Sequence, residues 1–146
     1  LEAFREIAIN KLNSTGKEWY GLMELAELNG QIEKIKGNYQ EAIRHYLEAF
    51  EYAKYTFWHH YHIAECYRKL GDYKKAREYI NNTLQIYPYG ASYRYESALI
   101  YEADGDMENA RAEMQRALDI WVDADEEYIK AKKARDKWAE WNTIIN

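Results

Sequence analysis

The sequence is poor in the residues that form tight turns and disulfides. It contains one proline and seven glycines in 146 residues, too few to punctuate the many short strands of an all-β fold. The single cysteine, Cys66, cannot form an internal disulfide, which predicts a cytoplasmic protein. No apolar run approaches the roughly 18 residues needed to span a bilayer, and no export leader is recognised. Neither membrane insertion nor secretion is therefore expected.

Positive charge is also scarce, because 20 Lys and Arg residues face 25 Asp and Glu residues. This balance disfavours binding to phosphate, so neither nucleic acid nor a membrane surface is expected as a partner. The basic stretch from Lys130 to Lys137 is interrupted by Asp136, which is typical of a solvated helix face. Charged residues make up 31% of the chain and Ala, Glu, Lys and Leu are frequent, so the composition predicts an all-α protein.

A short phrase recurs three times at intervals of 34 residues. Each copy has glycine, then Asn or Asp, and an alanine five residues after the glycine: Gly37-Asn38 with Ala42, Gly71-Asp72 with Ala76, and Gly105-Asp106 with Ala110. Glycine can adopt the left-handed backbone that ends one helix, and Asn or Asp can cap the next helix. The helical period continues after each alanine, at Tyr46 and Ala49, Ile80 and Thr83, and Met114 and Ala117. A small residue stands seven positions before each glycine, at Gly30, Ala64 and Ala98. Each phrase thus predicts a hairpin of two antiparallel helices.

With its 34-residue period and its small, aromatic and alanine positions, the chain resembles the tetratricopeptide repeat family. The middle copy fits best, with Ala64, Tyr67, Ala76 and Pro88 at the family's positions. The resemblance implies repeats at 23–56, 57–90 and 91–124. It implies an all-α solenoid of three repeats forming a single domain, 1–146, with an N-terminal helical segment at 1–22 and a capping helix at 125–146.

Both ends show helical patterns of their own. Leu1, Phe4, Ile7, Ala8 and Leu12 predict a first helix. The sequence from Thr15 to Glu18 is typical of a capping box that opens a second helix through Trp19 and Met23. Asp125 and Glu126 are expected to begin the last helix, which continues through Trp138 and Trp141.

Motifs for catalysis are missing: there is no Gly-rich phosphate loop, no His-Glu-x-x-His and no pair of closely spaced cysteines. His59, His62 and Cys66 fall on roughly one helix face and could hold zinc or copper. The preferred interpretation is a packed helix face, because a free cysteine commonly behaves as a small hydrophobe. We therefore expect no catalytic residue, no metal site and no cofactor.

The family resemblance implies a peptide-binding groove lined by the first helix of each repeat. Within it, Trp58, Tyr61 and Tyr95 are the expected aromatic anchors for a partner. The residues placed there by the family pattern are Glu24, Glu27, Gln31, Lys34, Trp58, Tyr61, Glu65, Arg68, Ser92, Tyr95, Leu99, Glu102, Ile129 and Lys133.

Family members that grip the C-terminal carboxylate of chaperones use basic residues and Asn at four groove positions, which here hold Glu27, Gln31, Tyr95 and Leu99. A ligand with apolar or cationic side chains is expected instead. The leading hypothesis is a non-catalytic module that binds a peptide or protein segment. The alternative is a structural spacer or self-association arm, which would form a homo-oligomer through array ends near Trp19 or near Trp138 and Trp141.

Overall fold

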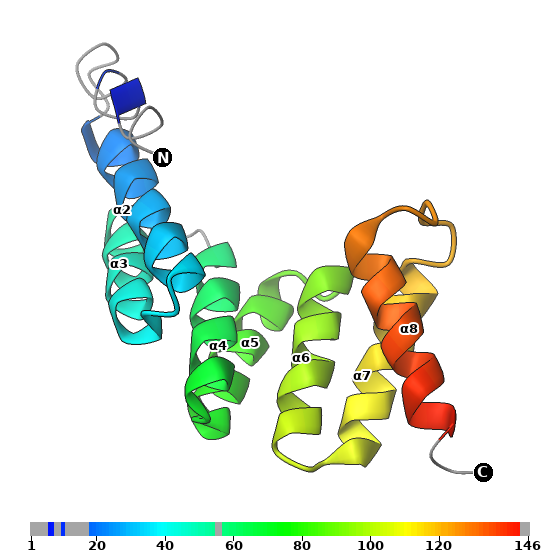
Figure 1. Ribbon diagram of the computed structural model, residues 1–146. Coiled ribbons are helices and arrows are strands. Elements are labelled where there is room, and N and C mark those ends of the chain that lie inside the picture. The colour runs from blue at the N-terminus through cyan, green and yellow to red at the C-terminus, as the bar shows by residue number, and fades with distance from the viewer. Residues whose placement is uncertain (1–5, 8–9, 11–17, 55–56, 144–146) are drawn as a thin grey trace. The chain divides into compact units, whose positions relative to one another are not determined.

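The computed structural model describes residues 6–7, 10, 18–54 and 57–143, which are entirely helical apart from turns and short connections (Figure 1). The chain divides into two compact units, Leu1–Asp72 and Tyr73–Asn146. The first unit contains α2 (Glu18–Ile35), α3 (Tyr39–Tyr52) and α4 (Trp58–Leu70). The second contains α5 (Tyr73–Ile86), α6 (Ala91–Ala103), α7 (Met107–Ile120) and α8 (Ile129–Thr143).

The predicted all-α fold is confirmed. Helices α2 and α3 pack as a helical hairpin in the first unit, and α6 and α7 pack as a helical hairpin in the second. The first helix predicted from Leu1, Phe4, Ile7, Ala8 and Leu12, and the capping box at Thr15, fall largely outside the described residues. None of the helices in the described part of the chain is long and apolar enough to cross a membrane.

The three glycine turns have the same backbone geometry. Gly37, Gly71 and Gly105 have φ angles of +83°, +78° and +82°, the left-handed conformation that glycine adopts without strain. In each turn the next residue donates its backbone N–H to the carbonyl five positions earlier, at 2.9–3.0 Å. This pattern is the Schellman motif, and it ends the helix that precedes each glycine. The helix ends predicted from the recurring glycines are confirmed.

Only part of the predicted capping is observed. The Asp106 side chain accepts a hydrogen bond from the Asn109 backbone N–H at 3.1 Å and caps α7 as expected. Asn38 stands at the start of α3 but makes no side-chain cap, because its amide donates to the Glu33 carboxylate at 2.7 Å. The expectation for Asn38 was therefore wrong: a neighbouring carboxylate competes for its side chain.

The helical stripe predicted after each glycine forms the packed side of the second helices. The repeated alanines Ala42, Ala76 and Ala110 are completely buried. The following stripe positions are also fully buried in each copy: Tyr46, Ala49, Ile80, Thr83, Met114 and Ala117. The three copies thus bury the same positions of the recurring pattern.

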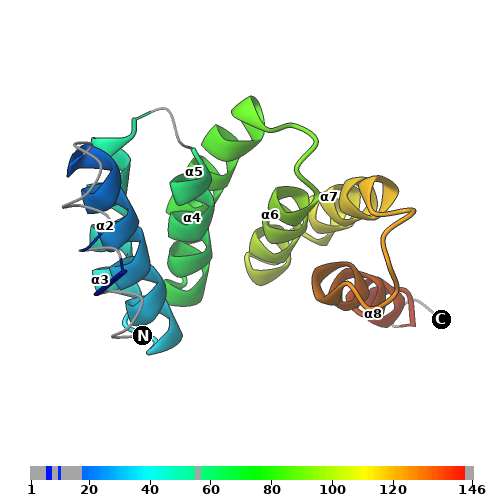
Figure 2. The same ribbon diagram turned by 90° about the horizontal axis from the view of Figure 1, so that it is seen from above.

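In the first unit, α2 and α3 pack side by side (Figures 1 and 2). Gly30 of α2 lies against the Tyr46 ring of α3. A Cβ atom at Gly30 would lie 2.9–3.0 Å from three atoms of that ring. The glycine therefore allows the close approach expected from its small size.

Replacing Gly30 with alanine is expected to destabilise the protein by about 1–2 kcal/mol. The clash with the buried Tyr46 ring costs about 1–3 kcal/mol, and the better helix propensity of alanine recovers at most about 1 kcal/mol. Chemical denaturation followed by circular dichroism measures the effect. In a Tyr46→Leu background the same substitution should be neutral or stabilising, and an equal loss there would contradict the proposed clash.

In the second unit, α6, α7 and α8 enclose one apolar cluster. Its buried members are Ala91, Ala98, Ala110, Met114, Ala117, Trp121, Ala131, Ala134 and Trp141.

Helix α8 begins at Ile129, whereas the acidic pair Asp125 and Glu126 had predicted a start at Asp125. The Asp125 side chain accepts the Glu127 backbone N–H at 2.9 Å, and this turn delays the start of the helix.

Candidate functional site

Side chains of α2 and α4 meet in a polar strip of the first unit, here called the α2–α4 seam. It comprises Glu27, Gln31 and Lys34 of α2 and Trp58, His59, Tyr61, His62 and Glu65 of α4. These two helices are the first helices of successive repeats. The family resemblance placed six of these residues in the groove, namely Glu27, Gln31, Lys34, Trp58, Tyr61 and Glu65, but not His59 or His62.

Glu27 is the centre of one half of the seam. The Gln31 amide donates to its carboxylate at 3.3 Å, and His59 Nε2 lies 3.4 Å from the other oxygen. The hydrogen bond from His59 is the main reason that the pKa of Glu27 is lowered, with a smaller contribution from a hydrogen bond of the Trp58 indole. Glu27 is therefore anionic and holds both Trp58 and His59 toward α2.

Lys34 and Glu65 form the other half. The Lys34 ammonium donates to Glu65 at 2.6 Å, and the Tyr61 hydroxyl donates to the same carboxylate at 3.0 Å. His62 Nδ1 lies 3.1 Å from both Lys34 Nζ and Glu65, while the imidazole stacks on Tyr46 with 5.0 Å between ring centres.

These neighbours decide the charge of Glu65. Burial by itself would raise its pKa, but the hydrogen bond from His62 and the charge of Lys34 outweigh burial and lower the pKa to about 2. Glu65 is consequently ionised at neutral pH. The seam therefore contains two carboxylates, Glu27 and Glu65, whose pKa values are lowered by their hydrogen-bond partners.

The predicted groove residues of the first unit fall on these helices, but their exposure differs. Trp58 is half-buried, whereas Tyr61 is only 7% exposed, so the open ring expected at Tyr61 is not observed. Its hydroxyl is bound by Glu65, which explains why the ring is drawn inward. The remaining predicted residues are half-buried: Glu24, Glu27, Gln31, Lys34, Glu65 and Arg68.

In the second unit, Glu102 has partners within its own unit. Lys137 Nζ and the Trp141 indole both donate to its carboxylate, at 2.7 and 2.9 Å. The Tyr95 ring is half-buried, with its centre 6.1 Å from that of Trp121. Ser92 and Leu99 are half-buried, and Lys133 and Ile129 are exposed.

His59, His60 and Cys66 are buried, whereas His62 lies partly exposed in the α2–α4 seam. His59 and Cys66 are completely buried, and His60 packs on Phe50 with 4.6 Å between ring centres. No three His, Cys, Asp or Glu side chains in the described ranges come together as metal ligands.

The two expected adhesive ends also differ from each other. Trp19 is 49% exposed, but Trp141 is only 3% exposed and belongs to the core of the second unit. Trp138 is half-buried against the same cluster. Trp141 is therefore not the exposed ring that was expected, because its indole N–H donates to Glu102 and its rings pack in the apolar cluster.

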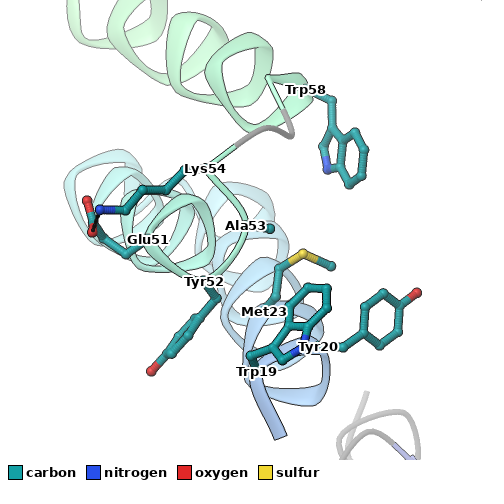
Figure 3. A pocket seen from close by; sticks show the side chains of 8 residues that line it. All are labelled: Trp19, Tyr20, Met23, Glu51, Tyr52, Ala53, Lys54 and Trp58. Atoms are coloured by element: carbon teal, nitrogen blue, oxygen red, sulfur yellow. Dashed lines mark ion pairs between the residues drawn. The ribbon is translucent and has the colours of Figure 1, made fainter. Parts of the chain in front are cut away.

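Sequence reasoning missed a second feature of the first unit, an open aromatic pocket of about 540 Å³. It lies where α2 begins, α3 ends and α4 begins, and is lined by Trp19, Tyr20, Met23, Glu51, Tyr52, Ala53, Lys54 and Trp58 (Figure 3). The signal was present as Trp19, Tyr20 and Met23 on one side of a helix. Only the fold brings Trp58 to them.

The fold and the repeated turns define the chain as a tetratricopeptide repeat protein, and the family model Tetratricopeptide repeat matches residues 68–125. A second family model, Regulator of microtubule dynamics protein 1-3, matches residues 19–92, slightly more than half of the chain. The chain belongs to this family. No curated protein matches it in sequence.

Solved structures share the fold at low sequence identity. The Arabidopsis OM64 TPR domain is 15% identical, with a TM-score of 0.68 over 81% of this chain and 94% of that chain. PcrH in complex with the chaperone binding region of PopD is 14% identical, with a TM-score of 0.73 over 84% and 92%. The first TPR of Spaghetti (RPAP3), bound to the HSP90 peptide SRMEEVD, is 18% identical, with a TM-score of 0.65 over 80% and 93%. These similarities show an all-α solenoid of helical repeats.

Proposed function

We propose that the chain is a non-catalytic module that binds a segment of another protein. The observation that carries this proposal is the α2–α4 seam, where Glu27 and Glu65 hold partly exposed side chains of two successive repeats in fixed positions. Preorganised side chains lower the ordering cost of binding. Structures of the same fold have been determined with the PopD region and with the HSP90 peptide, which supports a protein segment as the ligand.

The charges of the seam favour apolar or cationic side chains in the ligand. Lys34 is already paired with Glu65, and the Glu27 carboxylate stands where a carboxylate-binding member of the fold would need a cation. An acidic C-terminal peptide such as the one bound to RPAP3 is therefore disfavoured. In the second unit, the proposed contact residues are Ser92, Tyr95, Leu99, Glu102 and Lys133.

The test begins with partners captured from cell extract, with microtubule-associated proteins as first candidates because of the family's name. A partner's affinity is then measured by calorimetry. The variant Gln31→Ala/Arg68→Ala changes one seam residue and the predicted groove residue that follows the seam on α4. It should weaken binding by about 1–2 kcal/mol, as expected for moderate contact residues. Arg44→Ala is the control, because Arg44 is exposed on the outer helix α3. Equal affinities of all three proteins would overturn the proposal for the seam.

A further inference from the structure

The aromatic pocket of the first unit is open although its walls are apolar. Trp19, Tyr20 and Tyr52 are 49%, 41% and 37% exposed. Figure 3 shows the Trp58 indole on one side, the Trp19 and Tyr20 rings on the other, and Met23 between them. Large rings exposed together around a hollow are typical of a recognition site.

Carboxylates hold the polar ends of two of these rings. The Tyr20 hydroxyl is hydrogen-bonded to Glu24, which is the main cause of its raised pKa, and the charge of Glu27 raises it further. Glu27 also accepts a hydrogen bond from the Trp58 indole. Negative charge therefore lies beside the rings on the α2 side of the pocket.

Lys54, a cation at the rim of the pocket, does not neutralise the negative charge of Glu24 and Glu27. Lys54 lies 3.2 Å from Glu51, and each of these exposed groups neutralises the other (Figure 3). Apart from this ion pair, the pocket therefore consists mainly of aromatic rings with negatively charged carboxylates beside them. The faces of indole and phenol rings attract cations, and a guanidinium group stacks on them while its alkyl stem covers apolar surface.

We propose that this pocket docks an arginine side chain presented by a segment of a partner protein. The proposal extends the proposed function to a pocket that adjoins the α2–α4 seam and shares with it Trp58 and the adjacent carboxylate of Glu27, and it rests on that function only in taking the partner to be a protein. Trp19 and Trp58 would flank the guanidinium, with Glu24 and Glu27 supplying the opposite charge. An acidic segment would be repelled by the same carboxylates.

The test uses the full chain and a nine-residue peptide with one central arginine among Gly, Ser and Ala. Matched peptides carry norleucine or glutamate instead of arginine. Titrations followed by ¹⁵N NMR should shift the indole N–H signals of Trp19 and Trp58, with affinity for the arginine peptide at least about five-fold above that for the norleucine peptide. Equal affinity for norleucine, or no shift of these signals, would overturn the proposal.

Three variants test whether the arginine peptide binds in the pocket. Trp19→Ala should weaken binding of the arginine peptide about five-fold or more, and Glu24→Gln about two- to three-fold. Tyr89→Ala removes a ring that is 84% exposed in the second unit and should leave binding unchanged. Equal weakening by Tyr89→Ala would overturn the assignment to the pocket. Failure of these peptides leaves the seam proposal standing, because that proposal is tested at Gln31 and Arg68, which do not line the pocket.

Discussion

Replacing Trp141 with alanine is expected to lower the free energy of unfolding by about 3–5 kcal/mol, the usual cost of removing a large buried aromatic side chain. Trp141 is 3% exposed, belongs to the apolar cluster of α6, α7 and α8, and donates its indole N–H to Glu102. Urea denaturation of the two proteins measures the difference.

Two further variants separate packing from the hydrogen bond of Trp141. Trp141→Phe keeps a ring in the cluster but leaves the Glu102 carboxylate with one donor fewer, so a loss of about 1–2 kcal/mol is expected. Trp19→Ala, at a site that is 49% exposed, should change stability by no more than about 0.5 kcal/mol. Similar losses for Trp19→Ala and Trp141→Ala would contradict the burial of Trp141.

The second large effect is expected on acidification. The pKa of Glu65 is about 2 in the folded chain against an ordinary value of 4.5, so its ionised form stabilises the folded state. This contribution is present above about pH 4.5 and is lost as the pH falls toward 2, which corresponds to about 2–3 kcal/mol. Stability curves collected between pH 6 and pH 2 measure the loss.

The matched variant isolates the contribution of Glu65 from those of the other carboxyl groups. In Glu65→Gln, stability should fall less steeply between pH 4.5 and pH 2, because glutamine cannot be protonated in this range. Glu48→Gln, at a side chain that is 45% exposed, should retain the steep fall. If the two variants showed the same dependence on pH, the lowered pKa of Glu65 would not be the cause of the steep fall in stability.

The fold could be predicted because its determinants are local. A glycine with positive φ, a polar residue after it and an alanine five residues later are all visible in a short stretch of sequence. The structure gives the glycine and the alanine the same roles in every copy, whereas the side chain of the polar residue caps α7 at Asp106 but does not cap α3 at Asn38. The start of α8 could not be predicted as well, because Asp125 and Glu126 suit either a first helical turn or the side-chain turn that is observed.

The candidate site could be predicted only in outline. The repeat pattern selects the helix faces that carry Glu27, Lys34 and Glu65, but not the pairing of Lys34 with Glu65 or the inward position of Tyr61. These depend on the distance between two helices about 30 residues apart in sequence. The hydrogen bond from Trp141 to Glu102 could not be predicted for the same reason, because only the packing of α8 on α6 brings the two side chains together.

The three glycine turns also bear on how the chain folds. Their backbone hydrogen bonds join residues only three to five positions apart, and the extensively packed helix pairs within each unit are neighbours in sequence. Chains with mostly short-range contacts have little loop entropy to overcome and fold quickly. The α2–α3 and α6–α7 hairpins can thus nucleate on their own turns, and the ion pair of Lys34 with Glu65 forms when α4 packs on the first of them.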